Sequence, residues 1–158
     1  MPLSFHEYYR LFYDEYFPSK GEKVLERYLE AGGYLAILNG KLRTKDIIST
    51  LKTDINAVGK NTSVARNILG AIMDVAPDPV SFRKLAERAG VLPSTVQNYI
   101  ELFEGLYILL QVLFIDEGKR ILEKKDRELI IRNPLLVKAI AQWTERTLRE
   151  SVLYEWVV

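Results

Sequence analysis

Apolar residues recur at intervals of three and four along most of the 158-residue chain. That interval keeps one side of an α-helix apolar, so the pattern predicts a mainly α-helical protein. The predicted helices cover residues 4–17, 22–31, 44–58, 61–76, 81–89, 93–104 and 134–148.

Local signals mark several of the predicted helix ends. Ser4 and Glu7 have the spacing of a capping box, in which each side chain bonds a backbone N–H of the first turn. The pair Gly32-Gly33 supplies the left-handed conformation that often ends a helix. Ser81 is a good cap for the short helix that follows it, and Pro93 suits the first turn of the next one.

The pattern changes before the last predicted helix. Residues 106–115 form a nearly continuous apolar run, and a second extended segment is expected near residues 128–132. The order helix, helix, turn, helix, strand, wing, strand is that of a winged helix-turn-helix with a small β wing. We therefore expect three parts: a helical subdomain (1–60), a winged helix-turn-helix (61–132), and a C-terminal helix with the start of a further domain (133–158).

Composition fits a folded protein with little net charge. The chain is 48% hydrophobic and 27% charged, which is enough for a core and ordinary for a globular domain. The net charge of +1 argues against a strongly basic protein that wraps nucleic acid, although it allows a local basic face. Because cysteine is absent, disulfides, thiolate metal sites and cysteine nucleophiles are excluded.

The sequence also predicts a cytoplasmic protein without a membrane partner. Its longest uncharged apolar run, residues 105–115, is shorter than the roughly 18 residues of a membrane-spanning helix. The first residues lack the basic start and apolar stretch of a signal peptide.

Catalytic motifs are not found in this sequence, so we do not expect an enzyme. His6 is the only histidine, which excludes a histidine cluster within one chain. The segment Gly59-Lys60-Asn61-Thr62 is the nearest approach to a phosphate-binding loop. It has Asn61 where Ser or Thr would bind magnesium and Asp54 where the first glycine would stand, so a polar turn is the better interpretation. We expect no cofactor or metal on this chain.

The predicted helix-turn-helix is the one motif with a functional mechanism. Its second helix would present polar side chains to base edges in the major groove, namely Ser94, Thr95, Gln97, Asn98 and Glu101. This helix contains no Lys or Arg, so phosphate contacts would have to come from its neighbours. The candidates are Arg83, Lys84 and Arg88 on the preceding helix and Lys119, Arg120, Lys124, Lys125 and Arg127 in the wing.

Several short motifs give the chain a family resemblance. The segments that carry it are Pro2-Leu3-Ser4-Phe5-His6-Glu7-Tyr8, Gly32-Gly33-Tyr34, Asp54-Ile55, Val80-Ser81, Leu85-Ala86, Gly90-Val91, residues 95–103 and Glu155-Trp156-Val157-Val158. In this order and spacing they resemble the middle of archaeal and bacterial AAA-type ATPases. Those proteins join a P-loop core to a helical segment, a winged helix and a C-terminal nuclease-like domain.

The resemblance implies an accessory segment of such an ATPase. Residues 1–60 would pack as a helical lid on an ATPase core, and the winged helix would contact double-stranded DNA or a neighbouring subunit. ATP and magnesium are implied only for the P-loop core, which would precede Met1. The apolar end of the chain likewise predicts a truncated further domain.

Two other functions remain open from the sequence. One is a module for protein–protein interaction or self-association, because surfaces that pack against missing domains would be exposed and apolar. The other is a stand-alone winged-helix transcriptional regulator.

Overall fold

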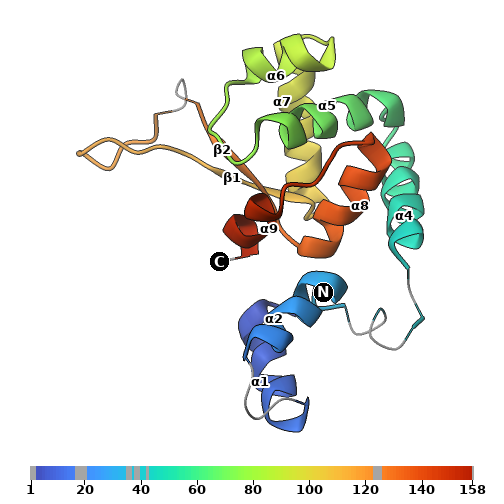
Figure 1. Ribbon diagram of the computed structural model, residues 1–158. Helices are drawn as coiled ribbons and strands as arrows, with labels where there is room; N and C mark the ends of the chain where they lie inside the picture. The colour runs from blue at the N-terminus through green and yellow to red at the C-terminus, as the bar shows by residue number, and fades with distance from the viewer. Residues whose placement is uncertain are drawn as a thin grey trace.

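Eight helices and one two-stranded sheet make up the part of the chain that the computed structural model describes, residues 3–16, 21–34, 37, 40–41, 43–122 and 126–157 (Figure 1). Mainly helical structure was the prediction, and it is confirmed. The elements are α1 (Phe5–Tyr16), α2 (Gly21–Ala31), α4 (Thr44–Ala57), α5 (Thr62–Val75), α6 (Phe82–Ala89), α7 (Pro93–Gly105), β1 (Leu109–Val112), β2 (Glu128–Ile131), α8 (Pro134–Thr144) and α9 (Glu150–Val157).

Helix α8 lies at the centre of the packing and contacts α2, α4, α5 and α9. Nine of its eleven residues are buried, including Leu135, Val137 and Ile140. Its start is fixed by Asn133, whose side chain accepts a hydrogen bond from the Leu135 N–H at 2.9 Å and donates one to the Gly32 carbonyl. The same asparagine thus caps α8 and joins it to the end of α2.

Helices α5, α6 and α7 pack on one another above α8 (Figure 1). Ser81 caps α6 by accepting a hydrogen bond from the Lys84 N–H, and Pro93 stands in the first turn of α7, both as predicted. Gly90 joins the two helices with a φ of 69°, a left-handed value that glycine adopts without strain. The apolar faces of α6 and α7 turn inward, so Leu85, Ile100 and Phe103 are fully buried.

The two strands form an antiparallel hairpin with Leu109 opposite Ile131 and Val112 opposite Glu128. Leu109 and Ile131 are buried at the end of the hairpin next to α7 and α8. Two isolated bridges extend the pairing: Ile115 pairs with Ile121 farther out, and Val80, just before α6, pairs with residue 127. Figure 1 shows the hairpin projecting well beyond the helices.

Helices α1 and α2 form a hairpin with a small aromatic core of their own. Tyr8, Val24 and Tyr28 are buried there, with the Tyr8 and Tyr28 rings 5.4 Å apart. Ser4 and Glu7 form the predicted capping box, in which Glu7 accepts from the Ser4 N–H at 2.8 Å and Ser4 accepts from the Glu7 N–H at 3.3 Å. Helix α1 thus buries Tyr8, and Phe5 and Phe12 are partly buried against the same small core.

Three sequence predictions need correction. The last predicted helix was to reach residue 148, but α8 ends at Thr144, because Glu145 adopts a left-handed φ of 56°. A separate helix, α9, follows and was not predicted. The first strand begins at Leu109 instead of residue 106, because Leu106 ends α7 and Tyr107 also has a left-handed φ of 56°.

The packing of α4 concerns the predicted boundary between the helical subdomain and the winged helix-turn-helix. Its buried residues Ile47, Leu51 and Ile55 belong to the same hydrophobic core as α5 and α8. Within the described residues, the hydrophobic core therefore continues across the predicted boundary at residue 60. The predicted limits 1–60, 61–132 and 133–158 themselves stay a prediction.

Candidate nucleic-acid interface

The outward side of α7 is polar, as the sequence predicted. Ser94, Gln97, Asn98 and Glu101 are exposed and Thr95 is half-buried, whereas Val96 and Tyr99 on the opposite side are buried. The Gln97 amide donates to the Glu101 carboxylate at 3.1 Å. This bond uses part of the hydrogen-bonding capacity of two candidate base contacts. Among the described residues, Ser94 and Asn98 are the exposed polar groups of this face whose side chains form no such bond.

Helix α6 contributes the nearest basic side chains. Arg83, Lys84 and Arg88 are all exposed. The Arg83 guanidinium pairs with Glu87 one turn later at 3.2 Å, a surface pair of small energetic value. No acidic residue of the described chain lies within ion-pair distance of Lys84 or Arg88. These two cations are therefore the ones that α6 can offer to a phosphate.

The remaining basic candidates belong to the wing, and the structure describes only some of them. Lys119 and Arg120 are exposed at its tip, where the Asp116 carboxylate accepts the Arg120 N–H at 2.8 Å and closes the turn. Lys124 and Lys125 lie outside the described residues.

Arg127 is held by the protein itself. It is half-buried, with its guanidinium carbon 3.9 Å from the centre of the Phe82 ring and its Nη1 donating to the Gln111 amide at 3.2 Å. Its backbone also exchanges two hydrogen bonds with Val80, of 2.9 and 3.1 Å. These contacts join the hairpin to the start of α6, a positioning role that the sequence did not reveal.

A second polar contact fixes the hairpin to α7. The Glu104 carboxylate accepts from the Gln111 backbone N–H at 3.1 Å and from the Gln111 side-chain amide at 2.7 Å. Gln111 therefore bridges Glu104 and Arg127, so that α7, β1 and the segment before β2 hold one another. Sequence reasoning missed this connection because the residues are 7 and 16 positions apart and follow no motif.

The hairpin surface is strongly apolar beyond its base. Exposed fractions reach 61% for Ile115 and 57% for Ile121. Six large apolar residues there are defined as the apolar strip: Leu110, Val112, Leu113, Phe114, Ile115 and Ile121. The sequence predicted a strand in this region, but the apolar run by itself did not distinguish a buried strand from an exposed one.

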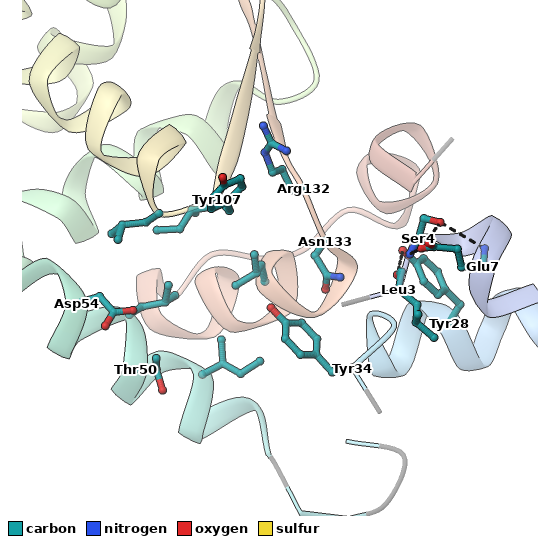
Figure 2. A pocket seen from close by; sticks show the side chains of 15 residues that line it. Leu3, Ser4, Glu7, Tyr28, Tyr34, Thr50, Asp54, Tyr107, Arg132 and Asn133 are labelled. Atoms are coloured by element: carbon teal, nitrogen blue, oxygen red, sulfur yellow. Dashed lines mark hydrogen bonds between the residues drawn. The ribbon is translucent and has the colours of Figure 1, made fainter. Parts of the chain in front are cut away.

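A cavity of about 490 Å³ lies between the start of α1, α2, α4, α8 and the base of the hairpin (Figure 2). Its wall combines apolar side chains with polar ones, and Figure 2 shows the carboxylates of Glu7 and Asp54 at opposite ends. Burial raises the pKa of Tyr28 and of Tyr34, whereas hydrogen bonds from Ser4 lower the pKa of Glu7. The separated carboxylates do not form an acid–base pair.

Among the described residues, no three metal-binding side chains cluster together. None of the described helices has the length and apolar character of a membrane span. Comparison with protein-family models, with curated proteins and with solved structures gave no match to the chain.

Proposed function

We propose that the chain is a non-catalytic module whose α6–turn–α7 unit contacts double-stranded DNA, with the hairpin as its wing. The order α5, α6, α7, β1, β2 supports a winged helix-turn-helix. The bridge between Val80 and residue 127 joins the hairpin to the start of α6 and so fixes the wing beside the two helices.

The polar outward face of α7 carries this proposal. Asn98 can form a bidentate pair with adenine, and Ser94 can reach a base or a phosphate. Both side chains are exposed while the rest of the helix is anchored by Val96, Tyr99 and Phe103. A rigid helix with a polar face is the arrangement that major-groove reading requires.

Electrostatics predict weak binding. Lys84, Arg88, Lys119 and Arg120 are the described exposed cations without an ion pair on α6 and the hairpin tip. Four phosphate contacts correspond to a slope of about −3.6 in log affinity against log salt. The acidic residues on the same elements reduce the attraction further: Glu87, Glu101, Asp116 and Glu117.

The resemblance to AAA-type ATPases gives the proposal a context. In such a protein the module would be an accessory segment beside a P-loop core, and residues 1–60 would be its lid. DNA contact would then place the ATPase on its substrate, while ATP and magnesium would bind the core alone.

The test is a titration of labelled duplex DNA followed by fluorescence anisotropy across a salt series. We expect Lys84→Glu/Arg88→Glu to abolish binding and Asn98→Ala to weaken it. Matched controls change the same residue types on other surfaces: Lys41→Glu/Lys45→Glu before and in α4, and Asn67→Ala on α5. Absence of binding at low salt by a folded protein, or equal losses in the controls, would refute DNA contact.

Protein–protein contact is the second candidate, and the apolar strip favours it. Exposed apolar patches rimmed by polar residues are typical of interaction sites. Apolar association weakens little with salt, in contrast to phosphate contacts, so the same salt series separates the two functions.

A further inference from the structure

The cavity between α1, α2, α4, α8 and the base of the hairpin has no part in the proposed DNA contact. Its volume of about 490 Å³ falls within the range of small-molecule sites, roughly 300–1,000 Å³. Aliphatic side chains such as Ile47, Leu51 and Leu136 form much of its wall. An apolar wall of this size suits a ligand whose body is largely hydrocarbon.

Three polar groups of the wall have capacity left for a ligand. The Asp54 carboxylate forms no ion pair or hydrogen bond within the described structure. Glu7 accepts from Ser4 through Oε2 alone, so its Oε1 has no partner among the described residues. The Tyr34 hydroxyl likewise has no described partner, and Figure 2 shows Tyr34 between the two carboxylates. All three groups can accept hydrogen bonds from a cation that carries N–H groups.

We propose that this cavity binds an extended aliphatic polyamine, with its terminal ammonium groups at Glu7 and Asp54 and an inner amine at Tyr34. Hydrogen bonds between ammonium and carboxylate groups are charge-assisted and therefore strong. The methylene chains between the amines cover Ile47 and Leu51, which removes apolar surface from water. This inference goes beyond the proposed DNA contact and does not depend on it.

Arg132 is the only cation among the described residues of the wall, and its side chain is engaged elsewhere. Its Nε donates to the Leu109 carbonyl at 3.1 Å, and its guanidinium carbon lies 5.5 Å from the centre of the Tyr107 ring. Figure 2 shows the guanidinium turned toward the strands, away from the space between Glu7 and Asp54. Two carboxylates and one guanidinium give the described wall a net charge of −1, so it attracts cations and disfavours anions.

The wall has the required protonation states at neutral pH. Hydrogen bonds from the Ser4 backbone and hydroxyl lower the pKa of Glu7, so this carboxylate is ionised. Burial raises the pKa of Tyr34, so its hydroxyl is neutral. Ionised carboxylates and a neutral hydroxyl are the forms that accept hydrogen bonds from ammonium groups.

Isothermal titration calorimetry with spermidine, at low salt and without DNA, tests the site. Glu7→Gln and Asp54→Asn each remove one charge and should each weaken binding by roughly threefold to tenfold. Glutamine also fits a capping box, so helix α1 keeps the signal that starts it. The matched controls Glu117→Gln and Asp78→Asn remove the same charges at exposed positions outside the cavity and should leave the affinity nearly unchanged.

Butylamine tests whether both ends of the ligand are held. It has a single ammonium group, so it should bind at least about tenfold more weakly than spermidine. Far-ultraviolet circular dichroism verifies that every variant is folded. A folded wild-type protein that does not bind spermidine, equal losses in the control variants, or butylamine that binds as tightly as spermidine would overturn the proposal.

Discussion

Tyr99→Phe removes one oxygen atom that connects α7, a helix of the proposed DNA-contacting unit, to the start of α5. The Tyr99 hydroxyl donates to the Asn61 carbonyl at 3.0 Å and accepts from the Asn61 N–H at 2.9 Å. Asn61 is the cap of α5, and Tyr99 lies on the buried side of α7. Phenylalanine keeps the ring and its edge contact with Phe103, 6.0 Å between centres, so only the two hydrogen bonds are lost.

The expected loss in the free energy of unfolding is about 1–2 kcal/mol. A hydrogen bond between neutral groups contributes roughly 0.5–1.5 kcal/mol net. Two bonds are lost, but Asn61 is exposed, so water can partly replace the hydroxyl at its backbone groups. For a protein of this size, about 1–2 kcal/mol lowers the melting temperature by roughly 2–8 °C.

Urea denaturation followed by circular dichroism measures this loss as a lower midpoint with an unchanged slope. Tyr107→Phe is the matched control, because Tyr107 is 64% exposed and no hydrogen bond of its hydroxyl occurs in the described structure. Its effect should stay within about 0.5 kcal/mol. A Tyr99→Phe variant as stable as the control would contradict the assignment of these hydrogen bonds.

Two further predictions concern local features. Glu145→Gly should stabilise the protein by up to about 1 kcal/mol, because the left-handed φ of 56° costs a non-glycine residue about 1–2 kcal/mol, whereas glycine costs only about 0.5–1 kcal/mol more conformational entropy. The substitution also removes the ion pair between Arg66 and Glu145, 2.9 Å long, which is largely exposed and contributes little to stability. A lower thermal midpoint of Glu145→Gly would contradict the predicted stabilisation. Hydrogen bonds from Ser4 lower the pKa of Glu7 below 4.5 in the folded protein, so its contribution is present above that pH and lost as pH falls through the depressed value. The stability difference between wild type and Glu7→Ala should accordingly shrink in acid, and a constant difference from pH 7 to pH 3 would argue against it.

Helix starts could be predicted because their signals are local. Ser4 with Glu7, Ser81 and Pro93 each act within one turn of their own position, and each is found where the sequence placed it. The physics of a cap involves only the first few backbone N–H groups, so neighbouring residues suffice to identify it.

The end of α8 depends on residues that are distant in the sequence, so the residues of the helix alone could not predict it. Arg66 of α5 donates to the Trp143 carbonyl at 2.7 Å, and Arg146 pairs with Asp74 of α5 at 2.8 Å. These contacts hold the chain as it leaves the helix, where apolar spacing alone suggested that the helix continues. Long-range partners thus override a local preference for helix.

The sequence predicted which polar residues of the candidate interface face outward. It did not predict which of their side chains are already engaged by other residues of the protein. The polar positions of α7 follow from helical spacing, which also identifies the buried side. Whether a side chain is free is decided by neighbours in space. Arg127 lies on Phe82, 45 positions earlier in the chain, and Gln97 is bonded to Glu101.

The central position of α8 has a consequence for how the protein is made. Helices α2, α4 and α5 all bury apolar side chains against a helix that the ribosome synthesises after them. At roughly 5–20 residues per second, these helices wait for seconds in the exit region with their apolar sides exposed to water. Until residue 144 has emerged, the packing of α2, α4 and α5 on α8 cannot be completed, so their apolar faces stay exposed on the nascent chain.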